Sequence, residues 1–368
     1  MNLFYYGCFF QITTIYELIY HGWNYINIDD AWQAPERNAK GEVYGNERFP
    51  DIKRLSDYVH AKGLKFGIYS SPGPKTCGGY VGSYQHEYQD AKTWADWGVD
   101  YLKHDYCHYA QVAPSSSEKD IQAPYIVMRD ALNQVSRDIV YCVGYGAPRV
   151  WYWGDEAGGN FWRTTRDIAD QWNIVMAIGC FQDVCAQVTK PGTYNDPDML
   201  VVGKIGKGWG QNVHDSYLSA DEQYSHVSLW SILSAPLLIG CDMSSMDDFT
   251  HNLLTNDEVI AINQDPLAMP AHKIIKDGQI WYKYLEDESI AVGFFNMDPY
   301  FILWDQDESE SVQRKKYDMS LDFEEIGIKG KYMVRDVWRQ KDLGIAEGSF
   351  STSVPYHGVH LIKLTPVK

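Results

Sequence analysis

The stretch WGVDYLKHDYC (97–107) carries the residue types best suited to chemistry in this chain. A glycine ends a predicted helix, a short apolar strand follows, and a carboxylate comes directly after that strand. In parallel α/β folds, catalytic side chains lie at the carboxyl ends of the strands. Asp105 is therefore placed to act on a substrate, and we predict that it is a catalytic nucleophile.

Asp105 is one of several aspartates that stand in such positions. Those that follow predicted strands are Asp29, Asp30, Asp105, Asp198 and Asp242, and Asp167 lies at a loop-to-helix junction after Arg163. Any one of them could instead cap a helix. Two carboxylates on opposite sides of a glycosidic bond suffice to hydrolyse it, one as nucleophile and one as acid and base. Lys103 and Arg163 would limit repulsion within such a cluster and hold Asp105 ionised.

The elements that must position these side chains alternate between strands and helices. Predicted strands lie near residues 25, 64, 100, 139, 161, 192 and 237, and predicted helices at 55–62, 88–97, 121–136, 168–178 and 221–233. Functional residue types always follow the strands, which is the pattern of a (β/α)8 TIM barrel. An eighth strand would have to come from the first few residues.

The pattern changes near residue 270. Short alternating apolar runs, separated by turn residues, occur at 279–284, 290–296, 332–336 and 358–364. Alternation of this kind is typical of half-buried antiparallel strands. We therefore predict a catalytic barrel over residues 1–268 and a C-terminal antiparallel β-sandwich over residues 269–368.

Composition argues against several kinds of partner. The formal net charge is −17, and aromatic residues make up 14% of the chain. Nucleic acids and anionic membranes need a cationic face, so neither is expected as a partner. No apolar run approaches ~18 residues, so no membrane span is expected. The many aromatic rings suit stacking on sugars, although most of them are expected simply to fill the core.

Other catalytic signatures do not follow the predicted strands. No serine nucleophile elbow, P-loop or GxGxxG spacing occurs there, and the seven cysteines form no CxxC pair. Two metal-site alternatives remain, one at Asp29 with Asp30 and one at His104 with Asp105. Glycoside hydrolysis by two carboxylates needs neither a metal nor an organic cofactor, so none is expected.

Longer motifs in the sequence indicate a known family. They are YINIDDAWQ (25–33), RFPDIKRLSDYVHAKGLKFGIYSSPGPKTC (48–77), WADWGVDYLKHDYC (94–107), WRTTRDI (162–168), NDPDML (195–200), SAPLLIGCDM (234–243) and VRDVW (334–338). In these words, which occur in family order across nearly all of residues 25–368, the chain resembles the retaining α-galactosidases and α-N-acetylgalactosaminidases of glycoside hydrolase family 27. The set is far more specific than any one word in it.

The resemblance implies a role for each matching position. Asp105 stands at the family's nucleophile and Asp167 at its acid/base, which implies retaining hydrolysis with carboxyl groups about 5–5.5 Å apart. Asp29 and Asp30 match the pair that binds O4 and O6 of galactose. The other matching pocket positions are Tyr69, Lys103, Cys142, Arg163, Asp198 and Met199, and Cys77 and Cys107 match a disulfide beside the site.

Three features depart from the family pattern. The chain begins inside the word that carries the first strand, with Leu3 at the place of a substrate-stacking tryptophan, so we expect that strand to be missing or vestigial. Ala31 stands at the usual disulfide partner of Cys8, so that bridge is not expected. Val143 replaces a glutamate that recognises O2. Three aromatic residues of the next loop could take over this contact or only pack the loop: Tyr145, Trp151 and Trp153.

The favoured hypothesis is an exo-acting enzyme that removes terminal α-galactose from oligosaccharides or glycoconjugates. The alternatives are α-N-acetylgalactosaminidase, β-L-arabinopyranosidase or α-glucan hydrolase activity, and an inactive sugar-binding protein. The Asp29–Asp30 pair favours a sugar with an axial O4 and an O6. A bonded Cys77–Cys107 pair would favour the periplasm or the exterior, although the first residues do not resemble a signal peptide. Homo-oligomers are usual in the family and are a further expectation.

Overall fold

The computed structural model describes residues 2–6, 17–206, 212–274, 279–297 and 315–367. The chain forms two compact units. The first comprises Met1–Arg166, Gly192–Asp198 and Lys207–Gly210, and the second comprises Asp167–Pro191, Met199–Gly206 and Gln211–Lys368. Each unit is described by itself below.

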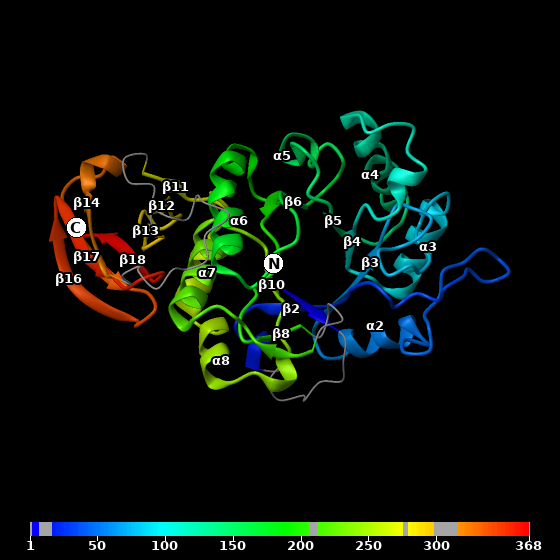
Figure 1. Cartoon of the computed structure of the whole chain (residues 1–368), viewed down its shortest axis with the longest axis horizontal. Helices are drawn as coiled ribbons and strands as arrows, with labels where there is room; N and C mark the ends of the chain where they lie inside the picture. Colours follow the sequence, from blue (N-terminus) through cyan, green and yellow to red (C-terminus); the bar gives the residue numbers. More distant parts are fainter. Residues whose placement is uncertain (1, 7–16, 207–211, 275–278, 298–314, 368) are drawn as a thin grey trace. The chain divides into compact units, whose positions relative to one another are not determined.

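A parallel sheet forms the centre of the first unit, with strands β1 to β7 in chain order (Figure 1). Their bounds are β1 Asn2–Tyr6, β2 Trp23–Ile28, β3 Lys65–Ser70, β4 Tyr101–His104, β5 Val140–Val143, β6 Phe161–Arg163 and β7 Tyr194–Asp196. Phe66, Leu102 and Trp162 on these strands are fully buried. Parallel strands are usually covered on both faces, which explains why they read as short apolar runs.

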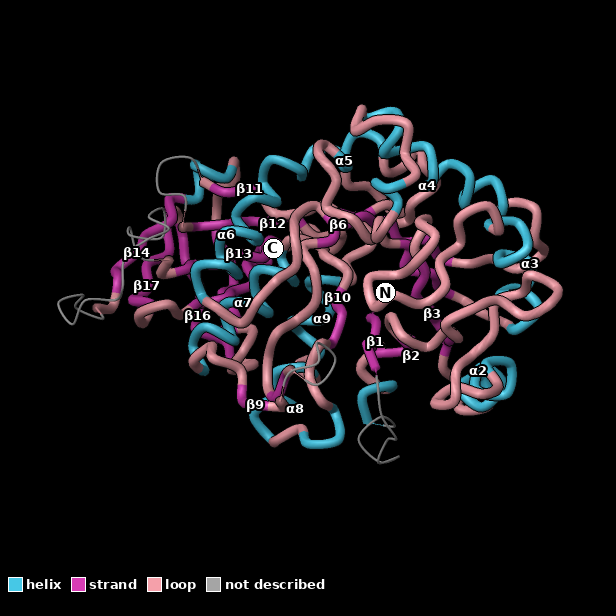
Figure 2. The backbone as a smooth tube through the Cα atoms, turned by 45° about the vertical axis from the view of Figure 1, so that its right-hand side comes forward, coloured by secondary structure: helices cyan, strands magenta, loops and turns pink. Residues whose placement is uncertain are grey.

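Helices α2 (Ile52–His60), α3 (Glu87–Trp97), α4 (Glu118–Leu132) and α5 (Val150–Trp153) belong to the same unit. Figures 1 and 2 show α2, α3 and α4 along the outer side of strands β2 to β5. The side chain of Asp51 caps α2 by accepting the backbone N–H of Arg54, and Gly98 ends α3 in the left-handed conformation that glycine adopts at low cost. These helices return the chain to the start of the next parallel strand.

The second unit combines helices with short strands and antiparallel sheets. Its helices are α6 Trp172–Cys185, α7 Ala220–Ile232, α8 Asp248–Leu254 and α9 Asp257–Asn263, and its first strands are β8 Lys204–Ile205, β9 His214–Asp215 and β10 Leu237–Ile239. A capping box between Ser219 and Glu222 begins α7. Most of α7 beyond its first turn is buried, as expected for a helix enclosed by other elements.

The C-terminal strands of this unit form a six-stranded antiparallel sheet in the order β11-β12-β13-β18-β15-β16 and a separate β14–β17 pair. Their bounds are β11 His272–Lys273, β12 Ile280–Tyr284, β13 Ile290–Phe295, β14 Tyr317–Asp322, β15 Lys331–Asp336, β16 Lys341–Glu347, β17 Ser349–Val354 and β18 Val359–Pro366. One apolar core joins both sheets, including Val292 and Leu364 from the larger and Leu321 and Val354 from the smaller. This is the packing of a β-sandwich.

The architecture is of the predicted class, a (β/α)8 barrel fold with a C-terminal antiparallel β domain. The expectation of a missing or vestigial first strand is corrected, because Asn2–Tyr6 form β1 and pair in parallel with β2. Strand pairing rests on backbone hydrogen bonds, so it does not require the side chains that the family word usually carries there. Cys8 lies outside the described residues.

Some boundaries also differ from prediction. The helix expected at 168–178 is observed as Trp172–Cys185. The residues before it form a loop, in which the carboxylate of Asp170 accepts the backbone N–H of Tyr217. The barrel boundary at residue 268 stays a prediction. Within the described part of the chain, no helix is both long and apolar enough to cross a membrane.

Candidate active site

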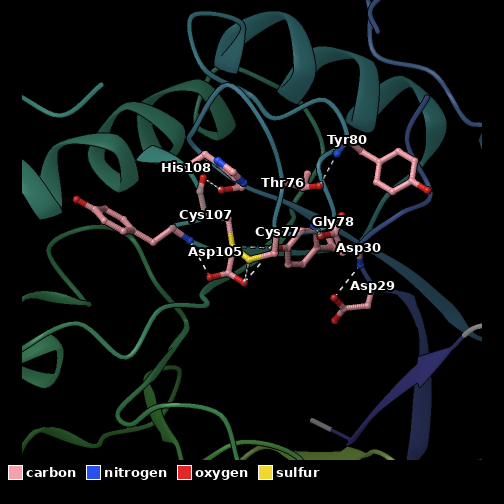
Figure 3. Close-up of a disulfide and its surroundings, with 12 residues drawn as sticks. Asp29, Asp30, Thr76, Cys77, Gly78, Tyr80, Asp105, Cys107 and His108 are labelled. Atoms are coloured by element: carbon pink, nitrogen blue, oxygen red, sulfur yellow. Dashed lines mark hydrogen bonds between the residues drawn. A yellow bond between two sulfur atoms is a disulfide. The ribbon is translucent and has the colours of Figure 1, made fainter. Parts of the chain in front are cut away.

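Asp105 follows β4 directly and lies beside the Cys77–Cys107 disulfide (Figure 3). Its two carboxylate oxygens face different neighbours. Oδ1 accepts the backbone N–H of Tyr106 at 2.8 Å, and Oδ2 accepts the hydroxyl of Tyr69 at 3.0 Å. Hydrogen bonds to both oxygens fix the orientation of the carboxylate, and a nucleophile in a site must be oriented in this way.

Opposing effects act on the protonation of Asp105. Burial raises the pKa of its carboxyl, while the Lys103 ammonium, the Tyr106 N–H and the Tyr69 hydroxyl lower that pKa. The net direction is upward because burial is the largest of these effects. Burial also raises the pKa of Tyr69, so this phenol stays protonated and donates to the carboxylate.

Lys103 connects this carboxylate to the end of β2. Its Nζ lies 3.0 Å from Asp29 Oδ2 and 5.3 Å from the centre of the Tyr69 ring. The ammonium therefore sits among three groups that the sequence predicted to meet, and it offsets the charge of two carboxylates at once. Asp29 keeps 34% of its side chain exposed, so the pair is accessible to a ligand.

Asp30 is held by two backbone donors. Its Oδ1 accepts the N–H of Ala31 at 2.6 Å, and its Oδ2 accepts the N–H of Gly78 at 2.6 Å. A Cβ at Gly78 would come within 3.2 Å of Asp30 Oδ2, so the loop that follows β3 lies directly on the carboxylate. Figure 3 shows Asp29 and Asp30 on the same side of Asp105.

The predicted disulfide is present, with the Cα atoms of Cys77 and Cys107 5.1 Å apart. It ties the loop that carries Gly78 to the end of β4, and Cys77 Sγ lies 4.0 Å from Asp105 Oδ2. These two cysteines and Asp105 come close enough together to surround a metal ion. The sulfur atoms are bonded to each other, however, and so are not available as thiolate ligands.

Arg163 pairs with Asp198, one of the strand-end aspartates that the sequence analysis grouped with it. Its Nη2 lies 2.8 Å from Asp198 Oδ2, and both side chains are buried. The sequence analysis assigned Arg163, with Lys103, to hold Asp105 ionised. Lys103 does lower the pKa of Asp105, whereas the effect of Arg163 on that carboxylate stays a prediction.

Asp196 is a candidate site residue that the sequence analysis missed. Its Oδ1 accepts the backbone N–H of Asp198 at 2.8 Å, and Asp198 itself has a left-handed backbone, with φ at 81°. Burial raises the pKa of Asp196 to about 6, while the charge of Arg163 lowers it. The signal was present in the word NDPDML, where Asp196 also stands at the end of a strand.

Three further predicted residues lie on other parts of the chain, and one of them, Cys142, pairs in register with Lys103 of β4. Asp167 lies on an exposed stretch between β6 and α6, and with Met199 it belongs to the second unit. The separation of Asp167 from Asp105 therefore remains a prediction. Cys142, in β5, is fully buried, and burial raises the pKa of its thiol.

The aromatic residues proposed to replace the missing O2 contact pack the loop after β5. Tyr145 stacks on Tyr106 with ring centres 4.7 Å apart, and Trp153 is buried against Tyr125. Trp151 contacts the neighbouring Tyr152 ring. Tyr145 also keeps 37% of its surface exposed.

Comparison with known proteins shows the family to which the chain belongs. The family model described as alpha galactosidase A matches residues 16–265, and that of the alpha galactosidase C-terminal beta sandwich domain matches residues 276–364. The chain belongs to the α-galactosidase family. This confirms the family, glycoside hydrolase family 27, that the sequence words indicated.

Individual relatives cover most of this α-galactosidase family chain. An α-galactosidase of Cyamopsis tetragonoloba is 37% identical over 355 residues, which is 94% of this chain and 78% of that protein. An α-N-acetylgalactosaminidase of Gallus gallus is 40% identical over 291 residues, 75% of this chain and 67% of that protein. The crystal structure of α-galactosidase I from Mortierella vinacea has a TM-score of 0.81 at 29% identity, covering 95% of this chain and 89% of that one.

Proposed function

We propose that this protein hydrolyses terminal α-linked galactose with retention of configuration, using Asp105 as the nucleophile and Asp167 as the acid/base. One observation carries the proposal. In a chain of the α-galactosidase family, Asp105 is held by donors on both oxygens and is connected through Tyr69 and Lys103 to Asp29. This is a nucleophile joined to a polar group that can bind sugar hydroxyls.

In the first step, an oxygen of Asp105 attacks C1 of the galactose while the C1–O bond to the leaving group breaks. Asp167 gives its proton to the departing oxygen, so a neutral alcohol leaves and a galactosyl ester of Asp105 remains. Lys103 and the Tyr69 hydroxyl favour the ionised form of Asp105 before the attack. The Tyr69 hydroxyl can keep its hydrogen bond to Asp105 while the carboxylate loses its charge.

In the second step, Asp167 accepts a proton from water as the water oxygen attacks C1. The bond between C1 and Asp105 breaks, and the carboxylate returns with its charge. Two inversions at C1 restore the original α configuration of the product. Neither step requires a redox change or a cofactor.

The group at the end of β2 suits galactose. Two adjacent carboxylates accept hydrogen bonds from two hydroxyls, and the Lys103 ammonium beside Asp29 donates to a third oxygen. Asp30 is fixed by the backbone of Ala31 and Gly78, so its position is set before the sugar arrives. An axial O4 and an O6 on one side of a pyranose match such a pair.

Turnover of p-nitrophenyl α-galactoside is the direct test. We expect Asp105→Ala to lower kcat by about 10⁴-fold or more, because the whole covalent route is lost. Azide should restore part of the turnover and yield β-galactosyl azide. Asp96→Ala removes an exposed carboxylate of α3 and should leave kcat unchanged. Wild-type turnover in Asp105→Ala would refute the assignment, and β-galactose as the first product would refute retention.

A second candidate specificity is α-N-acetylgalactosamine. It is favoured by the Gallus gallus relative and by Val143, a small residue where a glutamate is common. The ratio of kcat/KM for the p-nitrophenyl glycosides of galactose and N-acetylgalactosamine distinguishes the two. A ratio above one supports galactose, and turnover of neither would leave the inactive sugar-binding alternative. Formation of a homo-oligomer stays a prediction, which sedimentation of the full chain would test.

A further inference from the structure

Three tyrosine rings stack in series beside Asp105. Tyr125 and Tyr106 are stacked with ring centres 6.3 Å apart, and Tyr106 and Tyr145 are stacked at 4.7 Å with their planes 14° apart. The innermost ring, Tyr125, is fully buried, and the outermost, Tyr145, is 37% exposed. We call these three residues the tyrosine stack. One face of Tyr145 is covered by Tyr106, so its exposure leaves the opposite face as the outer surface of the stack.

The stack is anchored to the candidate nucleophile through the backbone. The hydroxyl of Tyr125 donates to the carbonyl oxygen of Asp105 at 3.1 Å, and the N–H of Tyr106 donates to Asp105 Oδ1 at 2.8 Å. Tyr109 and Trp153 pack against Tyr106 and Tyr125 respectively. The rings are therefore braced from behind, and their position relative to the carboxylate is fixed.

Two glycines also hold the backbone of Tyr145 in place. The N–H of Gly144 donates to the carbonyl of His104 at 2.7 Å. A Cβ at Gly146 would come within 2.1 Å of the carbonyl oxygen of Thr165, so this loop lies directly against the chain after β6. A ring on such a loop is already ordered, and stacking on it costs little additional conformational entropy.

The sheet order gives the stack a direction relative to the sugar. Asp29 and Asp30 follow β2, Asp105 follows β4, and Tyr145 follows β5, in a sheet ordered β2-β3-β4-β5. The carboxylates that bind galactose and the exposed tyrosine thus lie on opposite sides of Asp105. In a pyranose, C1 and C4 are at opposite ends of the ring. A galactose with O4 at Asp29 and Asp30 and C1 at Asp105 therefore continues, beyond C1, toward β5.

We propose that the outer face of Tyr145 binds the sugar to which galactose is linked, which makes Tyr145 a residue that determines specificity for the leaving group. The apolar C–H face of a pyranose stacks on an aromatic ring, and a braced tyrosine offers that surface at the right end of the galactose. This inference rests on the proposed function. It adds that the leaving group is recognised, which a pocket for galactose alone does not require.

The test compares raffinose, whose galactose is linked to another sugar, with methyl α-galactoside, whose leaving group is too small to stack. We expect Tyr145→Ala to lower kcat/KM for raffinose by roughly five- to tenfold, the usual size of one aromatic contact. The value for methyl α-galactoside should change less than twofold. Tyr145→Phe keeps the ring and should resemble the wild type. Tyr152→Ala removes another exposed tyrosine from the same segment and serves as the matched control.

The outcomes separate the two proposals. If wild-type protein cleaves neither substrate, the proposed function is wrong, and so is the proposed saccharide site at Tyr145. If the wild type cleaves both and Tyr145→Ala loses both equally, only the saccharide site is wrong, because the ring then acts on galactose or on folding. A selective loss for raffinose with an unchanged melting temperature supports the proposal.

Discussion

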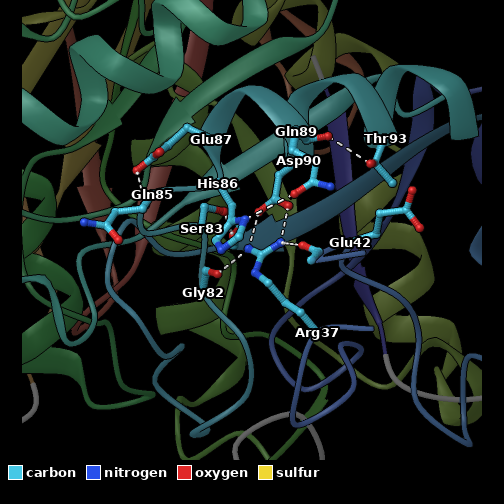
Figure 4. Close-up of polar contacts among 12 residues, drawn as sticks. Arg37, Glu42, Gly82, Ser83, Gln85, His86, Glu87, Gln89, Asp90 and Thr93 are labelled. Atoms are coloured by element: carbon cyan, nitrogen blue, oxygen red, sulfur yellow. Dashed lines mark hydrogen bonds and ion pairs between the residues drawn. The ribbon is translucent and has the colours of Figure 1, made fainter. Parts of the chain in front are cut away.

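Two ion pairs in the first unit use the same chemistry for different ends. Arg37 and Asp90 form a bidentate pair, with Nη1–Oδ1 at 2.6 Å and Nη2–Oδ2 at 2.7 Å (Figure 4). The same guanidinium nitrogens also donate to the carbonyls of Gly41 and Gly82. Lys103 and Asp29 instead make a single contact of 3.0 Å at the candidate site. The first pair is a clamp between loops and helix α3, whereas the second is a place where a ligand can bind.

Exposure separates the two pairs more clearly than distance does. Asp90 is 1% exposed and Asp29 is 34% exposed. A buried carboxylate needs a full set of donors, because a lost partner leaves an uncompensated charge. A half-exposed carboxylate is solvated by water, which a sugar hydroxyl can replace. The comparison teaches that a buried ion pair of this unit holds the fold together, whereas a partly exposed pair is available to a ligand.

Loss of the Arg37–Asp90 pair should lower the stability of the protein more than any of the other substitutions. We expect Arg37→Met to lower the free energy of unfolding by about 3–5 kcal/mol, since Asp90 stays buried without its counter-charge. Urea denaturation measures this loss, and kcat of the protein that remains folded should be close to wild type. Lys92→Met breaks an exposed pair with Asp96 and should cost under about 0.5 kcal/mol. Equal losses in the two variants would contradict the distinction.

The open pair should show the reverse pattern. We expect Lys103→Met to lower kcat/KM for p-nitrophenyl α-galactoside by about 10²–10³-fold, because a charge that stabilises Asp105 and binds the sugar is lost. The melting temperature should fall less than in Arg37→Met, since Asp29 is partly solvated and Asp105 keeps the Tyr106 N–H and the Tyr69 hydroxyl as donors. Lys53→Met, on the exposed face of α2, is the control for loss of a positive charge. A large loss of stability without a specific loss of kcat/KM would show that Lys103 acts on the fold, as Arg37 does, and not on the reaction.

Asp196 extends the comparison, because it is a buried carboxylate that stands at the end of a strand. It is buried like Asp90, whose pKa burial also raises, and its own pKa is raised to about 6, so the folded state holds its proton more tightly than the unfolded state. Stability supplied by this group is fully present below about pH 4 and is lost as pH rises through 6. Asp196→Asn does not titrate, so the variant should gain up to about 3 kcal/mol relative to wild type between pH 4 and 6. Thermal denaturation across this range measures it, and parallel pH curves would refute it.

Much of this fold was predictable because strand and helix signals are local. The strand from Lys65 to Ser70 and the helix from Glu87 to Trp97 were placed within a residue or two, since apolar runs and a terminal glycine mark them. Strand β1 was not, because its side-chain pattern departs from the family word while its backbone still pairs. Strands β16 and β17 also escaped prediction. β16 is almost entirely exposed, and the alternation of β17 rests on only Phe350, Thr352 and Val354 among serines.

The candidate site divides in the same way. The words around Asp29, Lys103 and Asp105 named the residues, and the structure places these three together. The partner of Arg163 could not be read from its position, because any of several carboxylates at the strand ends could have reached it. The clamp between Arg37 and Asp90 joins residues 53 positions apart and was invisible for the same reason.

The amino-acid sequence by itself determined the family, the alternation of strands and helices and the identity of the acidic residues, because each of these depends on residue type and local spacing. Only the tertiary structure decided which carboxylate pairs with which cation, how deeply Asp196 is buried, and that Tyr125, Tyr106 and Tyr145 stack beside Asp105. Those properties arise from distances and burial between segments remote in the chain. Charge and stacking energies follow those distances, and no local pattern encodes them.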